Sequence, residues 1–388
     1  MLSFKNTQEA FRHQSDSELT AAYWLFYTMR FPWLVKIGPV FVTTFLRLGL
    51  PIKSILKKTL FKQFCGGETL TETIPRLTQM NKYGVKTILD YSVEGEKSEK
   101  GFDDCCTEIC NTLTFGGQQK AVLFSACKIS GLGDTELLTK VQARLPLTPA
   151  EEKSIKALEQ RLKKIAETAQ KNKVPVFIDA EESWFQGVID EYVELLMKTY
   201  NRNEVIIYHT LQMYRHDRLN YLKKLKEKAA EEGFICGVKL VRGAYLEKEN
   251  ERAKTMGYPT PIQPDKDSTD LDYNLAVEFC IQNISYFSIC AGTHNEESCL
   301  RLTELMHQNK IQNSDVRISF AQLLGMSDHI SFNLASEGYI SAKYLPYGPV
   351  KSVLPYLFRR ASENTSIAGQ TGREFSLLKT ELQRRKQA

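Results

Sequence analysis

The sequence lacks the features that mark several large classes of protein. Its 388 residues carry a formal net charge of only +5, and it has no basic patch interleaved with aromatic residues of the kind that binds nucleic acid. No uninterrupted apolar run reaches the roughly 20 residues that a membrane-spanning helix needs. The polar start of the chain, residues 1–20, has no signal-peptide pattern. With 42% hydrophobic and 25% charged residues, the composition is typical of a globular protein.

The nine cysteines indicate neither a disulfide framework nor a metal site. Their number is odd and they are scattered, several of them inside apolar strand-like runs, where free thiols pack as small hydrophobic groups. The only cluster is Cys105, Cys106 and Cys110. It has no CxxC pair and no accompanying histidine ligand, so we expect no metal there. A reducing compartment suits such a chain, and we expect a cytoplasmic protein.

An aromatic-rich segment, residues 21–52, follows the polar start. Charged residues and two prolines interrupt it, so we expect a pair of helices packed on the main domain, within an N-terminal helical extension over residues 1–80. An alternative is an interfacial segment. It is followed by Lys53, Lys57, Lys58 and Lys62, and basic residues beside aromatic ones suit a membrane surface. Peripheral contact with the inner face of a membrane is therefore a second expectation.

From residue 81 onward, short β-branched runs alternate regularly with helical stretches. The expected strands are residues 87–93, 122–129, 174–179, 205–212, 237–241, 287–291, 316–320 and 340–344. Eight such units predict an α/β fold with a parallel sheet. Closure into a (β/α)8 TIM barrel over residues 81–370, followed by a tail over residues 371–388, is the economical solution. A doubly wound open sheet is the alternative, but no GxGxxG follows any strand.

Polar residues gather where these strands end, and the chemistry of such a barrel lies at the carboxyl ends of its strands. The groups there are Asp90, Lys128, Asp179, Gln212, Lys239, Arg242, Thr293, His294, Asn295 and Tyr344. Each has a simpler interpretation. Lys128 could form a Schiff base, Asp179 and the two glutamates after it could cap the next helix, and His294 could be structural. We expect Gly243 to allow close backbone approach to a bound group.

The C-terminal helix carries an unusual stripe. Tyr356, Arg359, Arg360 and Glu363 fall at i, i+3, i+4 and i+7, so they share one helical face. Paired guanidinium groups match a carboxylate or phosphate with two parallel hydrogen bonds each. We interpret the stripe as an anion clamp for a small acid. The alternative is a solvated charged face.

Five motifs together resemble the proline dehydrogenase family, in its monofunctional form. They are K-x-S at Lys128, D-A-E-E from Asp179, L-V-R-G-A-Y from Leu240, T-H-N from Thr293, and Y-x-x-R-R-x-x-E-N from Tyr356. The resemblance implies a flavoenzyme on a distorted (β/α)8 barrel that oxidises L-proline to Δ1-pyrroline-5-carboxylate. It implies FAD as hydride acceptor and a quinone as the next electron acceptor. Because we expect no second catalytic domain after residue 388, we also expect a separate pyrroline-5-carboxylate dehydrogenase for the product.

The resemblance also assigns roles to residues. The catalytic group would be Lys128, Asp179, Tyr344, Arg359 and Arg360. Proline would further contact Leu240, Tyr245 and Tyr356, with Glu94 as a gate that pairs with the first arginine. FAD would contact Gln212, Lys239, Arg242, Gly243, Ala244, Thr293, His294, Asn295 and Glu363.

Helix eight would have to cross the barrel mouth, because Arg359 lies about ten residues, or roughly 15 Å, along it. We interpret Tyr344 as the end of strand eight. Two other functions remain open: a 4-hydroxyproline dehydrogenase, and a flavin-free barrel lyase that uses Lys128.

Overall fold

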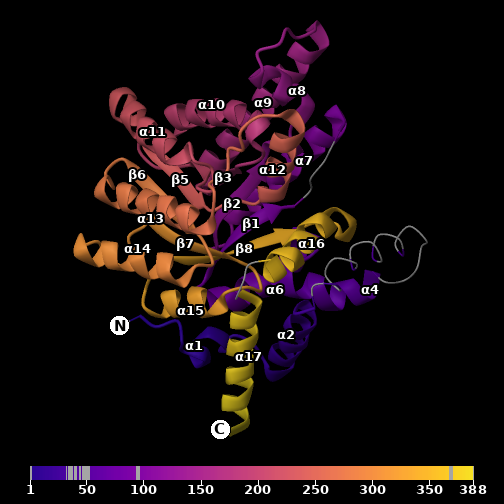
Figure 1. The fold of residues 1–388 in the computed structure, drawn as a ribbon, viewed down its shortest axis with the longest axis vertical. Coiled ribbons are helices and arrows are strands. Elements are labelled where there is room, and N and C mark those ends of the chain that lie inside the picture. Colours follow the sequence, from indigo (N-terminus) through magenta and orange to yellow (C-terminus); the bar gives the residue numbers. More distant parts are fainter. Residues whose placement is uncertain are drawn as a thin grey trace. The chain divides into compact units, whose positions relative to one another are not determined.

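The structure is a computed structural model that describes residues 2–31, 33, 38, 42, 45, 53–92, 97–366 and 370–387. Eight parallel strands form a closed barrel in the order of the sequence (Figure 1). The prediction of a (β/α)8 barrel is therefore confirmed. The strands are β1 (Lys86–Tyr91), β2 (Val122–Lys128), β3 (Val176–Asp179), β4 (Ile207–Gln212), β5 (Cys236–Val241), β6 (Phe287–Gly292), β7 (Ile318–Leu323) and β8 (Ser341–Tyr347).

Strand eight is longer than predicted, so our interpretation of Tyr344 as its last residue is wrong. The ladder with β1 pairs Tyr344 with Ile88 and continues to Tyr347, which pairs with Tyr91. A strand end before Pro346 is the simpler expectation, because a proline has no N–H to donate to a ladder. Its carbonyl oxygen nevertheless accepts a hydrogen bond of 2.8 Å from the Gly66 N–H.

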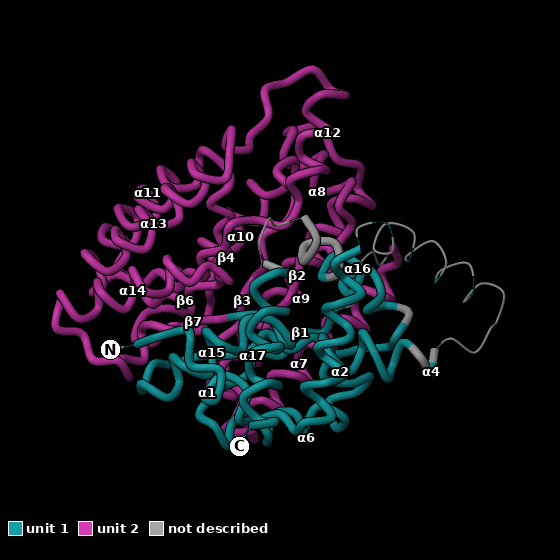
Figure 2. The backbone as a smooth tube through the Cα atoms, turned by 60° about the horizontal axis from the view of Figure 1, so that its bottom comes forward, with its two compact units in different colours: residues 1–92, 322–388 teal, residues 93–321 magenta. Residues whose placement is uncertain are grey.

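The chain divides into two compact units, residues 93–321 and residues 1–92 with 322–388 (Figure 2). The helices of the first unit are α7 (Glu99–Gly117), η2 (Ile129–Gly131), α8 (Thr135–Gln142), α9 (Pro149–Asn172), α10 (Ser183–Tyr200), α11 (Arg218–Glu232), α12 (Leu246–Met256), α13 (Lys266–Gln282) and α14 (Glu296–Gln308). Helix α9 shows why these residues form a helix. Thr148 and Glu151 make a capping box, Pro149 occupies the first turn, and Lys173 ends the helix in the left-handed conformation.

The second unit joins the two ends of the chain. Its helices are α1 (Thr7–Phe11), α2 (Asp16–Met29), α4 (Lys53–Leu56), η1 (Lys57–Phe61), α5 (Lys62–Phe64), α6 (Leu70–Asn81), α15 (Asp328–Ser336), α16 (Val350–Ser366) and α17 (Gln370–Gln387). Phe11, Phe26 and Phe64 share one buried apolar cluster with Leu357 and Leu378. The aromatic-rich early helices therefore pack on the C-terminal ones. Over the ranges that the structure describes, no helix is both long and apolar enough to cross a membrane.

A buried ion pair fixes the outer side of β8 within this unit. Lys343 is 1% exposed at its side chain, and its ammonium lies 2.7 Å from Asp328 Oδ1. The other oxygen of Asp328 accepts a hydrogen bond of 2.9 Å from Gln14 and lies 3.4 Å from His13 Nε2. Burial raises the pKa of Asp328, but the charge of Lys343 and the contact with His13 outweigh it, and the pKa lies well below its usual value. The carboxylate stays ionised and tied to both ends of the chain.

Replacing Lys343 with Met should destabilise the protein strongly, because it leaves Asp328 buried without its cation. Loss of one partner of a buried pair costs about 3–5 kcal/mol, which urea unfolding would measure. The double variant Lys343→Met with Asp328→Leu should recover most of that loss. Lys379→Met, at an exposed position of α17, is the matched control. The prediction is wrong if Lys343→Met and Lys379→Met change the free energy of unfolding equally.

Candidate active site

Three neighbouring strands of the unit 93–321 bring Asp179, Thr210 and Lys239 together. The Lys239 ammonium forms an ion pair with Asp179 Oδ1, and the Thr210 hydroxyl donates to the same oxygen at 3.1 Å. The ammonium also lies 4.7 Å from the centroid of the Phe177 ring. Lys128 is the register partner of Asp179 on β2. The strands therefore hold a desolvated ion pair between Lys239 and Asp179, with Lys128 in register with Asp179 on the neighbouring strand.

Glu181 is a site residue that we missed from the sequence. Its side chain is buried, and its Oε1 accepts a hydrogen bond of 2.8 Å from the Ser130 N–H. Burial raises the pKa of Glu181 to about 7, although the positive charge of Lys128 opposes the shift. The D-A-E-E motif contained this residue, but we considered its glutamates only as helix caps. A raised carboxyl pKa beside a lysine is typical of functional sites.

The alternative interpretation of the D-A-E-E motif was that its acidic side chains cap the following helix, α10. The structure shows no side-chain cap hydrogen bond there. Glu182 is the N-cap residue of α10 but makes no side-chain cap hydrogen bond. The Ser183 N–H instead donates to Glu249 of α12 at 2.6 Å. Asp179 contacts Thr210 and Lys239, so neighbouring strands and not the helix hold its carboxylate.

Arg242 organises the carboxyl ends of β5 and β6. Its guanidinium donates to Asp270 Oδ1 and to the Thr293 hydroxyl, both at 2.6 Å, and lies 4.5 Å from the centroid of the Tyr273 ring. The Thr293 hydroxyl in turn accepts a hydrogen bond of 3.1 Å from the Asn295 N–H. Of the predicted cofactor ligands, the structure thus joins Arg242, Thr293 and Asn295 in one network. His294, between the last two, is half-buried.

The loop after β5 approaches its neighbours too closely for a side chain at Gly243. This glycine has φ +144°, and a Cβ there would lie 2.4 Å from the Tyr214 ring. The next residue, Ala244, donates its N–H to Gln212 Oε1 at 3.2 Å. The Gln212 amide also donates to the carbonyl oxygen of Glu181 at 2.8 Å. Gln212 therefore links two of the predicted site loops.

Two predicted substrate contacts differ in their surroundings. Leu240 is completely buried, and its register partners are Leu211 and Ala291. Because side chains alternate along a strand, Leu240 points away from the face on which Lys239 meets Asp179. The structure does not join it to that pair, and its contact with substrate stays a prediction. Tyr245 is half-buried at the start of α12.

Helix α16 carries the predicted clamp in the unit formed by the chain ends. The Arg360 guanidinium lies 5.0 Å from the centroid of the Tyr356 ring, as expected for residues four apart on one helical face. Arg360 is 8% exposed, whereas Arg359 is half-buried. A solvated charged face is therefore wrong for Arg360. Glu94 and the side chain of Glu363 lie outside the described residues.

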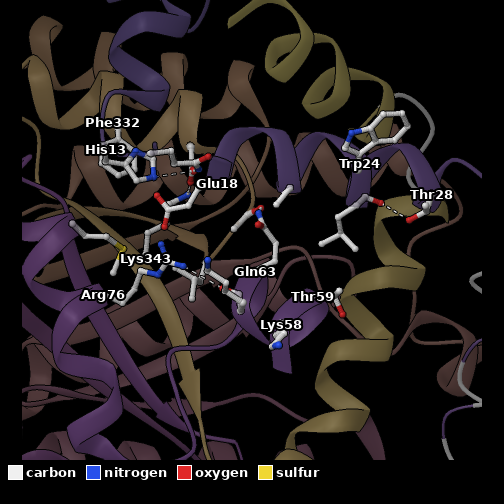
Figure 3. A pocket seen from close by; sticks show the side chains of 18 residues that line it. His13, Glu18, Trp24, Thr28, Lys58, Thr59, Gln63, Arg76, Phe332 and Lys343 are labelled. Carbon is white, nitrogen blue, oxygen red and sulfur yellow. Dashed lines mark hydrogen bonds and ion pairs between the residues drawn. The ribbon is translucent and has the colours of Figure 1, made fainter. Parts of the chain in front are cut away.

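A cavity of about 400 Å³ in the same unit is lined by neither arginine of the clamp. Its lining includes Trp24, Arg76 and Lys343. Figure 3 shows the charged Arg76 and Lys343 near His13, with Trp24 at the opposite side. Tyr344, the neighbour of Lys343, is not among the lining residues. This cavity therefore belongs to the packing of the chain ends and not to the candidate active site.

The comparisons with known proteins point in the same direction as these residues. Residues 73–373 match the family model described as proline dehydrogenase. The chain is 32% identical over 98% of its length to "Proline dehydrogenase 1, mitochondrial" of Dictyostelium discoideum, and covers 74% of that protein. It is 34% identical to a carbapenem biosynthesis protein, CarD, of Pectobacterium carotovorum, with 83% of each chain covered. It is also 30% identical to the hydroxyproline dehydrogenase of Xenopus laevis, with 97% of this chain and 88% of that protein covered.

A similar solved structure is that of proline utilization A from Bdellovibrio bacteriovorus inactivated by N-propargylglycine. The TM-score is 0.71 at 23% sequence identity, over 82% of this chain. At that identity the likeness supports the fold alone. The chain spans about a third of the protein it matches there, 35% of its length.

The buried carboxyl of Glu181 should make stability depend on pH. Its folded pKa of about 7 exceeds the value near 4.3 of an unfolded glutamate, so the folded chain binds this proton more tightly. The stabilisation is complete below about pH 4.3 and is lost as the pH rises to about 7. Between pH 5 and pH 7 the native protein should therefore lose about 2 kcal/mol relative to Glu181→Gln. Urea unfolding at the two pH values measures this, with the exposed Glu204→Gln as control. Parallel pH dependences for the native protein and Glu181→Gln would contradict the assignment.

Proposed function

Because the chain belongs to the proline dehydrogenase family, we propose that it oxidises L-proline to Δ1-pyrroline-5-carboxylate with FAD as the hydride acceptor. The observation that carries the proposal is the pair Arg359 and Arg360, with Arg360 buried against Tyr356. The carboxylate is the only anionic group of proline. A desolvated guanidinium that can bind it bidentately is what orientation of this substrate needs.

The chain's own residues bind and orient the substrate in this proposal. Arg359 and Arg360 would hold the carboxylate, and the family resemblance adds Lys128 and Asp179 to the catalytic residues. Tyr344, Tyr245 and Tyr356 form the apolar wall around the ring. FAD, when bound, accepts the hydride from the ring carbon that becomes doubly bonded to nitrogen. A hydrophobic wall with few polar groups is the usual lining of such a site.

The residues at the strand ends suit FAD chemically. Its pyrophosphate is anionic, and Arg242 presents a cation beside the Thr293 hydroxyl. Lys239 supplies a buried ammonium group within β5, paired with Asp179, and such a group would suit a flavin ring that gains negative charge on reduction. The loop at Gly243 brings backbone close to its neighbours. We assign FAD binding to Gln212, Lys239, Arg242, Gly243, Ala244, Thr293, His294, Asn295 and Glu363.

Electrons would leave the flavin for a quinone, and the product would pass to a separate pyrroline-5-carboxylate dehydrogenase. A quinone dissolved in a membrane implies peripheral contact with that membrane. Trp24 and Trp33 are 57% and 59% exposed, and Tyr27 and Phe31 are also exposed, as suits an interfacial segment. The location in the cell stays a prediction: we expected the cytoplasm, whereas the D. discoideum relative is named as mitochondrial.

Anaerobic addition of L-proline to the purified, flavin-loaded protein tests the proposed reaction. The flavin absorbance should bleach, and a pyrroline product should accumulate once a quinone analogue is added. A lyase that uses Lys128 would need no flavin and leave its absorbance unchanged. A non-catalytic amino-acid-binding protein would bind proline without bleaching. Either result would overturn the proposal.

The arginine clamp predicts a specific loss of proline binding. Arg360→Met or Arg359→Met should weaken binding by about 2–5 kcal/mol, as for truncating one partner of a buried charge pair. That corresponds to a loss of about 30-fold or more in kcat/KM, with little change in FAD content. Arg384→Met, on α17, is the matched control. A KM for proline within about twofold of the native value would contradict the clamp.

A second candidate function, oxidation of 4-hydroxyproline, is favoured by the X. laevis relative. We expect Tyr344 to disfavour this activity, because a tyrosine beside the pyrrolidine ring would crowd the hydroxyl group of 4-hydroxyproline. The expected preference for L-proline in kcat/KM is at most about 10²-fold, since a pocket rejects an added hydroxyl weakly. Tyr344→Ser should narrow that preference, mainly by losing proline affinity. Steady-state kinetics with both substrates decide this, and equal use of them by the native protein would remove Tyr344 from the specificity argument.

Membrane contact predicts that the protein floats with liposomes in a density gradient. Flotation should be stronger with anionic lipid, because Lys57, Lys58 and Lys62 follow the aromatic segment. Trp24→Gln should reduce flotation, since it removes an exposed aromatic ring. Leu195→Gln, at an exposed apolar position of α10, is the control. Recovery of the native protein only at the bottom of the gradient would exclude the contact.

A further inference from the structure

The cavity of about 400 Å³ that the chain ends form has no part in the proposed reaction. Its described lining residues all belong to the unit of residues 1–92 and 322–388, and they come from α2, η1, α5, α6, α15, β8 and the loops before α2 and α15. A volume of this size lies within the range of pockets that hold small organic ligands, about 300–1,000 Å³. The cavity is therefore large enough for a ligand, and the chemistry of its lining decides which class of ligand it suits.

Part of this lining is apolar. Trp24 and Leu25 of α2 line the cavity together with Met80 of α6, Leu324 and Phe332. Met80 and Phe332 are buried, whereas Trp24 is 57% exposed, so the apolar lining extends from the interior to the surface. Burial of an apolar group against these side chains would favour binding, because it removes apolar surface from water.

Three cationic side chains line the same cavity, and the described residues provide no ion-pair partner for any of them. Arg76 is half-buried, and its guanidinium donates to Gln79 Oε1 at 3.0 Å and to the Lys62 carbonyl oxygen at 3.2 Å, which are both uncharged acceptors. The other two cations are the ammonium groups of Lys58 and Lys62, both at exposed positions. The positive charge of these side chains is therefore available to a ligand.

The acidic residues of the described lining already have partners within the protein. The Glu18 carboxylate accepts hydrogen bonds from the N–H and the hydroxyl of Ser15, both at 3.0 Å, in the capping box of α2. Asp328 pairs with Lys343, another lining residue. With four lysine and arginine side chains against two carboxylates, the described lining carries a net positive charge, which favours an anion.

We propose that this cavity is a second small-molecule site and that it binds an anionic amphiphile, a molecule with one carboxylate or phosphate group on an apolar body. The Arg76 guanidinium binds the anionic group, because its fork matches a carboxylate or phosphate with two hydrogen bonds. Trp24 and Leu25 contact the apolar body. Figure 3 shows Arg76 and Trp24 at opposite sides of the cavity, so the two ends of such a molecule are recognised at separate places. Fatty acids and membrane lipids both have this chemistry.

Isothermal titration calorimetry of the flavin-loaded, full-length protein with decanoate tests the proposal, with decanol and decylammonium as probes of the same chain length. Decanoate should bind about tenfold or more tightly than decanol, because a hydrogen bond between two charged groups is stronger than one to a neutral hydroxyl. Decylammonium should bind more weakly than either. Equal affinities for decanoate and decanol would overturn the proposal.

Variants locate the bound decanoate in this cavity rather than at the proposed proline site. Arg76→Met should weaken decanoate binding about tenfold or more and leave decanol binding nearly unchanged. Ala21→Phe, at an exposed lining position of α2, fills the cavity and should weaken both. Arg144→Met, at an exposed position outside the lining, is the control for Arg76→Met. Arg360→Met should lower proline binding but keep decanoate binding. Equal decanoate affinities of Arg76→Met and Arg144→Met, or loss of decanoate binding in Arg360→Met alone, would overturn the proposal.

Flotation with vesicles of phosphatidylcholine and phosphatidylglycerol distinguishes the two sources of the ligand once decanoate binding has been measured. If a membrane lipid fills the cavity, Arg76→Met should float less than Arg144→Met, because the lipid phosphate loses its guanidinium partner. Equal flotation of the two variants identifies a soluble acid as the ligand. Both results keep the site, and neither depends on oxidation of proline.

Discussion

Charge buried at the ends of parallel strands must be paired inside the protein, and the candidate site depends on this constraint. An unpaired ammonium in such a place would cost several kcal/mol. Lys239 satisfies this constraint by pairing with Asp179, whose carboxylate also accepts a hydrogen bond from the Thr210 hydroxyl. Each of the three side chains is thereby held by a partner on another strand. The positive charge is fixed before any ligand arrives, so its orientation costs nothing at the moment of binding.

The same constraint acts at the other end of the chain, on β8. Lys343 and Tyr344 are adjacent, and side chains of a strand alternate between its two faces. One face carries the buried Lys343–Asp328 pair, and the opposite face is left for Tyr344. His13 and Gln14 contact the same carboxylate, so the turn between α1 and α2 contributes to the placement of the strand. The placement of Tyr344 thus depends on an ion pair on the opposite face of its own strand.

The two arginines of α16 illustrate how one helix can serve both packing and binding. Leu354 and Leu357 belong to the apolar cluster that the chain ends form, while Arg360 lies over the Tyr356 ring. Burial of the arginine removes water that would compete for its donors. A carboxylate ligand supplies the partner that such a guanidinium favours. The proposed flavin-binding residues other than Glu363 lie on β4–β6 or directly after these strands.

Much of this protein was determined by the sequence alone. Periodic β-branched runs located eight strands to within a few residues, because burial on both faces of a parallel sheet requires such runs. The spacing of Tyr356 and Arg360 determined that they meet, since residues four apart on a helix are neighbours. Only the tertiary structure decided where β8 ends, because a proline inside a ladder is tolerated when its carbonyl finds another partner. It also decided that Glu181 is buried beside Ser130 rather than exposed as a cap. These outcomes depend on contacts between segments that are distant in the sequence, and local sequence patterns do not predict such contacts.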